Sequence, residues 1–175
     1  MKNHSFNQRK QNGAVLFVSL VILVIMTLIG ITGMQTTILE EKMSGNFKDK
    51  TLAFQAAESA LKSGESFIQT TTYLPGFNGL TPGLYKPTTG TLPPQWDVNV
   101  VDWSDATKVA VDPVAFTSLA QQPAFILEQL DIPVGGSLKM NNSILAIRSY
   151  RVTARGVGAT INSPVMVQSV YNKFE

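Results

Sequence analysis

Four aspartates lie close together in the middle of the chain and could supply oxygen ligands to a cation. They fall within 16 residues: Asp97, Asp102, Asp105 and Asp112. Carboxylates are ligands that Ca²⁺ prefers, but the segment lacks the glycine and the terminal glutamate at the spacing of an EF-hand loop. Ordinary solvated acids of loops and strand ends are therefore favoured over a calcium site, and we predict no metal ligands.

Other residue types that carry chemistry are scarce. The sequence has no cysteine, which excludes disulfides, thiolate metal sites and cysteine nucleophiles. The single histidine, His4, lies in the first 13 residues and cannot act as a general base if that segment is removed. Residues 135–139 (GGSLK) lack the spacing of a phosphate loop. A net charge of +2 with scattered basic residues does not favour nucleic acid. We predict no catalytic or cofactor-binding residue and no enzymatic activity.

A long apolar run follows the first residues of the chain. Residues 14–34 include no charged side chain, and 13 of these 21 residues are Val, Leu, Ile or Phe. At about 1.5 Å per residue, a helix of this length crosses a hydrocarbon core of roughly 30 Å. The run is longer than the hydrophobic region of a secretory signal peptide, although cleavage near residues 30–33 is an alternative. Lys2, Arg9 and Lys10 before the run favour a cytoplasmic amino terminus.

The entrance to this run, QRKQNGAVLFV at residues 8–18, resembles the type IV prepilin signal. The resemblance implies that a prepilin peptidase cuts between Gly13 and Ala14 on the cytoplasmic side and methylates Ala14. A glycine before the cut fits a protease that must approach an extended backbone closely. Residues 1–13 are therefore interpreted as a leader that is removed.

The fifth residue after this cut, Val18, departs from the family pattern. Most pilins have a glutamate there, which is thought to meet the amino terminus of a neighbouring subunit in the fibre. A buried carboxylate without a partner is costly, so a subunit without a neighbour on that side gains by losing it. The departure favours a subunit at or near the pilus tip. The alternative is that Val18 is one more lipid-facing valine.

Helical spacing continues after the apolar run and predicts an amphipathic helix over residues 35–70. The apolar positions recur every four and then every seven residues: Leu39, Met43, Phe47, Phe54, Leu61 and Ile68. We expect the later half of this stripe to pack on the protein's own sheet and the earlier half on neighbouring helices. Ser44, Gly45 and Asn46 predict a weak or bent point. The charged residues 40–42 and 48–50, Asp49 included, are predicted to form a solvated face.

The remaining residues, 71–175, predict a small globular head. Proline and glycine make residues 70–95 a long loop. Residues 96–100 and 124–128 have the patterns of strands, and residues 144–154 and 165–171 predict a terminal hairpin. The fold class is α+β and type IV pilin-like: a long N-terminal membrane-spanning and amphipathic helix packed on a small antiparallel sheet.

Two runs of the helix, LEEKMSGNF at residues 39–47 and LAFQAAESAL at residues 52–61, look like the PilX family of type IV pilus minor pilins. The resemblance implies a structural subunit that helps prime pilus assembly, remains at the tip, and supports adhesion and twitching motility. The implied partners are other minor pilins, the major pilin, a PilY-family tip adhesin, the prepilin peptidase and the inner-membrane assembly platform. The implied location is the bacterial inner membrane, in a single pass with the head in the periplasm, and then the pilus tip.

Two other functions fit parts of the same pattern. A tip pseudopilin of a type II secretion system has the same architecture, but these proteins usually carry a large inserted domain for which residues 71–175 leave little room. A signal-anchored periplasmic sensor or enzyme would also begin with an apolar helix.

Overall fold

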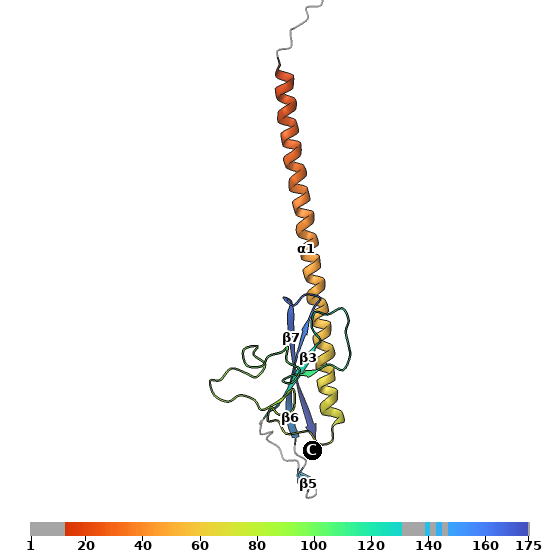
Figure 1. Cartoon of the computed structure of the whole chain (residues 1–175), viewed down its shortest axis with the longest axis vertical. Helices are drawn as coiled ribbons and strands as arrows, with labels where there is room; N and C mark the ends of the chain where they lie inside the picture. Colours follow the sequence, from red (N-terminus) through yellow and green to blue (C-terminus); the bar gives the residue numbers. More distant parts are fainter. Residues whose placement is uncertain (1–12, 131–138, 141–142, 145–146, 175) are drawn as a thin grey trace, which may run out of the picture. The chain divides into compact units, whose positions relative to one another are not determined.

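The computed structural model describes residues 13–130, 139–140, 143–144 and 147–174 (Figure 1). The chain divides into two compact units, Met1–Gly45 and Asn46–Glu175. Helix α1, Ala14–Thr70, supplies the described secondary structure of the first unit and contributes residues 46–70 to the second. Most of the run at 135–139 lies outside the described residues, as do residues 1–12 of the predicted leader.

Helix α1 is uninterrupted in its hydrogen-bonded secondary structure, so the prediction that residues 44–46 are locally melted was wrong, while a bend there stays a prediction. A helical glycine costs only about 1 kcal/mol relative to alanine. Leucine, glutamate, lysine and methionine before Gly45 are good helix formers, which is enough to carry the helix across that position.

The second unit contains a mixed sheet in the order β1-β3-β6-β7, with β2 also paired to β3. The strands are β1 (Leu84–Tyr85), β2 (Ala110–Val111), β3 (Ala124–Leu130), β6 (Ile147–Val157) and β7 (Pro164–Phe174). A separate pair joins β4 (Lys139–Met140) to β5 (Ser143–Ile144). The predicted strand at 124–128 and the terminal hairpin are confirmed.

One pairing departs from the predicted antiparallel sheet. Strand β1 runs parallel to β3, with Leu84 opposite Leu127 and Tyr85 opposite Glu128. A hairpin would force neighbouring strands to run antiparallel, but β1 is separated from β3 by residues 86–123, which impose no such direction.

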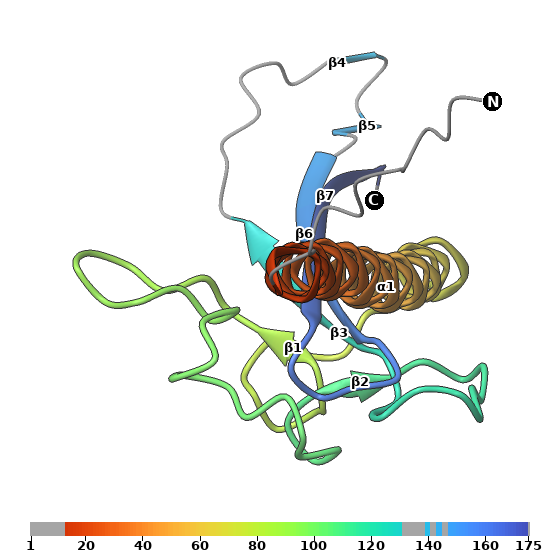
Figure 2. The same ribbon diagram turned by 90° about the horizontal axis from the view of Figure 1, so that it is seen from above.

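Helix α1 covers one face of this sheet through small residues (Figure 2). The helix buries Ala53, Ala56, Ala57, Ala60, Gly64 and Ile68. Burial of Ile68 and the alanines confirms the predicted packing, whereas Phe54 is 48% exposed. Large side chains do not fit near Ala53 and Ala57 because the backbones approach closely there: a Cβ on Gly156 of β6 would lie 2.2 Å from the carbonyl oxygen of Ala53.

The opposite face of the sheet is covered by loops and turns rather than by a helix. Val101, Trp103 and Val109 form a buried cluster with Ala124 and Ile126 of β3. The strand predicted for residues 96–100 was wrong, because these residues form turns. The Asp97 carboxylate accepts a hydrogen bond from the backbone N–H of Asn99 (2.9 Å), and the N–H of Val100 donates to the Asp97 carbonyl (2.9 Å). These bonds fold the backbone back and override the alternating side-chain pattern.

A buried ion pair lies across strands β3 and β6. The Glu128 side chain is 1% exposed, and its Oε2 accepts a hydrogen bond from Nη1 of Arg151 (3.3 Å). Burial raises the pKa of Glu128, and the charge of Arg151 opposes that shift. Glu128 Oε1 has no hydrogen-bond partner among the described residues, so the carboxylate depends on Arg151.

We predict that Arg151→Leu lowers the free energy of unfolding at pH 7 by about 3–5 kcal/mol, because it leaves a buried carboxylate without its cation. Glu128→Gln should cost much less, since it removes the buried charge itself. Part of the stability that Arg151→Leu loses at pH 7 should be regained at pH 5. At that pH the Glu128 carboxyl group, whose pKa is raised, takes up a proton more readily. Urea unfolding of the full chain in detergent, followed by tryptophan fluorescence, measures both effects. Equal losses for the two variants would contradict this account.

Candidate functional surfaces

The predicted cleavage site coincides with the beginning of helix α1. Gly13 has a φ of +49°, a conformation that glycine adopts at little cost, and the helix begins at Ala14. The Gly13 carbonyl accepts hydrogen bonds from the N–H groups of Leu16 (3.1 Å) and Phe17 (3.4 Å). Gly13 thus marks the change from non-helical to helical backbone, and the bond between Gly13 and Ala14 lies at that boundary.

The apolar part of α1 presents a surface suited to hydrocarbon. This helix is long and apolar enough to cross a membrane by length and composition. Its hydroxyl groups bond to carbonyls of their own helix: Ser19 to Leu16 (2.9 Å), Thr27 to Val24 (2.7 Å) and Thr32 to Leu28 (2.8 Å). These bonds satisfy the hydroxyls without water, so the segment can meet either lipid or other helices.

The residues predicted to act in assembly differ in exposure. Val18 is 53% exposed in the first unit, and Leu39 and Met43 of the same unit are also exposed. In the second unit Phe47 is 74% exposed and Phe54 about half exposed, whereas Leu61 packs at the margin of the core. Phe47 and Phe54 are therefore available to other chains, while Leu61 contributes mainly to the head.

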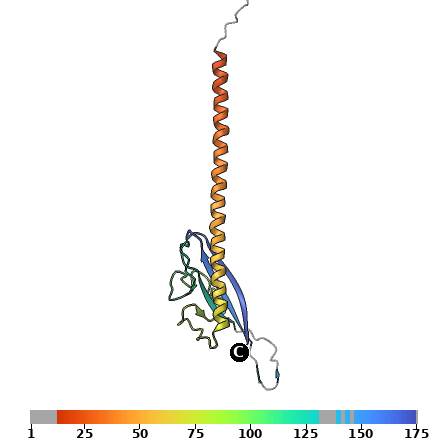
Figure 3. The same cartoon turned by 90° about the vertical axis from the view of Figure 1, so that its right-hand side faces the viewer.

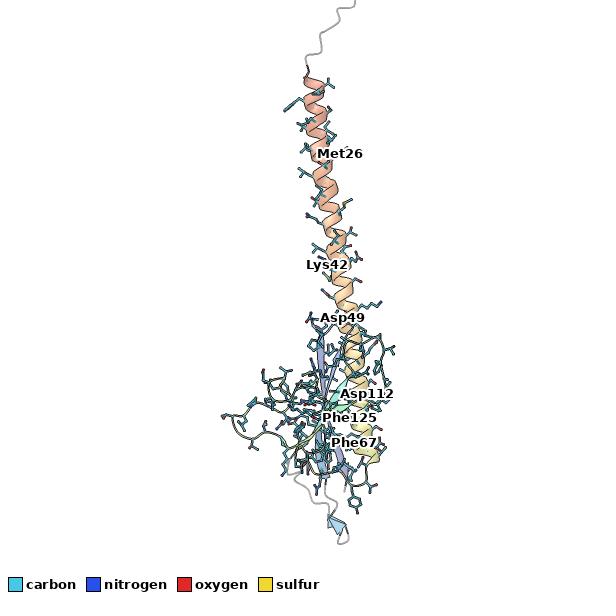
Figure 4. All side chains as sticks on the ribbon, in the orientation of Figure 1. Met26, Lys42, Asp49, Phe67, Asp112 and Phe125 are labelled. Atoms are coloured by element: carbon cyan, nitrogen blue, oxygen red, sulfur yellow. The ribbon has the colours of Figure 1, made fainter. Side chains whose placement is uncertain are left out.

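Asp49, on the face predicted to be solvated, remains accessible to solvent and also holds the β6–β7 hairpin to the helix (Figure 4). Its Oδ1 accepts hydrogen bonds from the N–H groups of Ala159 (2.6 Å) and Thr160 (3.3 Å), and its Oδ2 from the Thr160 hydroxyl (2.5 Å). A Cβ on Gly158 would lie 2.5 Å from the backbone carbonyl oxygen of Asp49, so the turn needs glycine at this point. Local sequence does not reveal this contact, because its partners lie 110 residues apart.

The hydrogen bond from the Thr160 hydroxyl lowers the pKa of Asp49, which gives the hairpin contact a pH dependence. A carboxyl group with a lowered pKa in the folded state stabilises the fold above its unfolded value, near 3.8, and this contribution is lost as the pH falls below it. We predict that Asp49→Asn lowers the urea midpoint at pH 7 and flattens its dependence on pH between about 5 and 2.5. If the urea midpoint of Asp49→Asn depended on pH as steeply as that of the wild type, the role of Asp49 in holding the hairpin would be contradicted.

The four central aspartates serve the backbone rather than a common site. Asp102 accepts hydrogen bonds from the N–H (2.9 Å) and hydroxyl (2.6 Å) of Ser104, and Asp105 makes the same pair with Thr107. The Ser104 and Thr107 hydroxyls are the main cause of the lowered pKa of Asp102 and Asp105.

The fourth aspartate, Asp112, is buried beside the helix. Its Oδ1 accepts from the Ser63 hydroxyl (2.9 Å) and the Val114 N–H (3.1 Å). Across the described residues, no group of three or more His, Cys, Asp or Glu is arranged to hold a metal ion. The four aspartates therefore act as turn-forming residues in this part of the chain.

These features define a class of protein: a pilin-like α+β protein in which one long helix is apolar at its start and packs on a sheet at its end. Family models agree with this class over most of the chain. The PilX N-terminal model matches residues 12–62, and the model described as Type IV pilus assembly protein PilX C-term matches residues 50–173. The chain belongs to the PilX family of type IV pilus assembly proteins. Neither a curated protein nor a solved structure gives a significant match.

Family membership determines the general function. The protein is a minor pilin that acts in type IV pilus assembly, in a family of structural pilins rather than enzymes. It is a membrane-anchored pilus component and interacts with other components of the pilus.

Proposed function

We propose that the protein is an inner-membrane prepilin that is cut between Gly13 and Ala14, methylated on Ala14, and then drawn into the fibre. In this proposal the leader is cytoplasmic and the head periplasmic. The observation that carries it is the position of Gly13, a glycine of positive φ immediately before a helix whose residues 14–34 carry no charge. Cleavage there leaves the whole apolar helix on the mature subunit, whereas a secretory signal would be discarded.

Extraction from the membrane requires the helix to be stable in two environments. Lipid and a bundle of apolar helices are similar in polarity, so transfer between them costs little when no polar group is left unpaired. The internally bonded hydroxyls of Ser19, Thr27 and Thr32 meet this condition. Exposed Phe47 and Phe54 add apolar surface for neighbouring pilins beyond the membrane-spanning part.

We further propose that the subunit primes assembly and sits in the tip complex, where it supports adhesion and twitching motility. Its specific partners would be other minor pilins, the major pilin, a PilY-family adhesin, the prepilin peptidase and the inner-membrane platform. Val18 supports the tip position, because it replaces the carboxylate that would need a neighbouring amino terminus.

Val18→Glu tests the tip position. A carboxylate at this depth is costly without a partner, by about 2.5–3.5 kcal/mol at the bilayer centre and less near the interface. At the tip no neighbour supplies the partner, so we expect the amount of the variant in purified pili to fall several-fold. Quantitative immunoblotting of sheared fibres measures this, with Val15→Glu as a control for the general cost of a carboxylate. Incorporation of Val18→Glu at the wild-type level or above would contradict the tip assignment.

Deletion of the gene separates pilus function from secretion. We expect loss of surface fibres and of twitching, with normal release of exoproteins. Normal fibres with defective exoprotein release would instead identify a tip pseudopilin of a type II secretion system. Unchanged fibres, twitching and secretion would favour a signal-anchored sensor or enzyme.

A further inference from the structure

Strand β7 forms an edge of the sheet in the second unit. It pairs with β6 through an unbroken register, from Val157 opposite Pro164 to Ile147 opposite Phe174. Within the described parts of the chain β7 pairs with no other strand, and Figure 3 shows it along the outer side of the head. Alternate residues of such a strand direct N–H and C=O groups away from the sheet, where another strand can bind them.

The usual features that prevent edge pairing are missing from β7. The strand is 11 residues long, its register has no bulge, and its one proline is its first residue, Pro164. Its one charged residue, Lys173, is engaged elsewhere: Nζ donates to the carbonyl oxygens of Ile68 (3.0 Å) and Thr71. A long, regular edge without a free charge favours pairing with an added strand.

The two sides of this edge have different chemistry. On the side away from the helix, Val170 is 58% exposed and Phe174 is 65% exposed. On the helix side, Ser169 donates a hydrogen bond to Glu65 (2.6 Å). Glu65 also lines a shallow groove of about 440 Å³ together with Leu61 and Lys62. An added strand would therefore present apolar side chains to Val170 and Phe174 and polar side chains to the groove.

The direction of β7 argues against antiparallel pairing with a second copy of the same strand. The loop before β7 is bonded to Asp49, and Lys173 near its end is bonded to Ile68 and Thr71, so β7 runs in the direction of helix residues 49–71. An antiparallel copy would point the Asn46 ends of the two helices in opposite directions. The proposed fibre requires the helices of neighbouring subunits to run in the same direction, so an antiparallel pair of β7 strands does not fit it.

We propose that the free edge of β7 binds an extended segment of a different pilus subunit, which adds one strand to the sheet. The segment alternates apolar and polar residues to match the two sides of the edge. This inference rests on the proposed function, since it requires that the chain enters a heteromeric pilus complex. Main-chain hydrogen bonds supply the affinity, and the alternating side chains supply the specificity.

Hydrogen exchange on the full-length protein tests this proposal. The protein is purified in detergent after production alone and after production with the other pilus subunits of its cell. In the complex we expect alternate amides of β7 to exchange about a hundredfold more slowly than in the protein alone. We also expect Val170→Lys to reduce co-purification at least tenfold. Val98→Lys, at an equally exposed valine (58%) in the turns at residues 96–100, should co-purify normally.

Each possible outcome either supports or overturns the proposal that the β7 edge binds a strand of another subunit. A chain that co-purifies with pilus subunits while its β7 amides exchange freely would overturn the edge proposal and leave the proposed function intact. Protection of β7 in the protein produced alone, with a doubled mass, would reassign the edge to a second copy. A wild-type chain that binds no pilus subunit would contradict the proposed function as well. Unchanged urea-unfolding midpoints for Val170→Lys and Val98→Lys would show that a loss of co-purification is not due to unfolding.

Discussion

Gly156→Ala is expected to lower the free energy of unfolding by about 3 kcal/mol or more. The new Cβ would lie 2.2 Å from the Ala53 carbonyl oxygen and 2.4 Å from the Ala57 amide nitrogen. Both atoms belong to helix backbone, which cannot move aside as the end of a flexible side chain can. Strand β6 would have to withdraw from the helix and open the core on that face of the sheet. Urea unfolding of the full chain in detergent, followed by tryptophan fluorescence, measures the loss.

Gly76→Ala is the matched control for this prediction. A Cβ at Gly76 meets the Asn78 side chain no closer than 3.7 Å, which is an ordinary contact, and its φ does not require glycine. The control should unfold within about 0.5 kcal/mol of the wild type. If Gly156→Ala were equally stable, the close approach of β6 to the helix would be wrong.

Gly13→Val is expected to have the largest effect on function. Valine is strained at a φ of +49°, and its branched side chain hinders the close approach that a protease needs. The variant should retain its leader and fall to less than a tenth of the wild-type amount in purified fibres, because an uncut leader keeps charged residues at the end of the helix. Immunoblots of membranes and sheared pili measure the two effects.

Gly45→Ala is the control for a glycine change elsewhere in the helix. No atom lies within 4 Å of a Cβ at Gly45, so the variant should be processed and incorporated normally. If Gly13→Val lost its leader as fast as the wild type, cleavage at this position would be refuted.

Sequence patterns predicted those elements whose periodicity is strong. The long helix, the strand beginning at Ala124 and the terminal hairpin all follow from residue spacing. Strand β6 ends three residues later than expected, at Val157, because pairing with β7 continues to Pro164. The turn at residues 96–100 was missed, because the side chain of Asp97 decides the backbone there rather than the alternation of Trp96, Val98 and Val100.

Contacts between distant parts of the chain could not be predicted from one sequence. Asp49 resembles any other helical surface acid until the hairpin loop is placed against it. Likewise, the need for alanines and for Gly64 in the helix becomes clear only when strand β6 lies against them: a Cβ on Gly64 would lie 2.6 Å from Val152 Cγ1. The apolar spacing placed Phe54 on the same stripe, but where the helix and β6 backbones approach closely only small residues such as Ala53 and Ala57 fit.

The mature amino terminus is the most direct test of the account. Mass spectrometry of the wild-type protein, purified from membranes of piliated cells, should find a chain that begins at Ala14 and carries one added methyl group on its amino nitrogen. A protein that still begins at Met1, or one cut after the apolar run near Gly33, would contradict the proposed processing and assembly of this subunit.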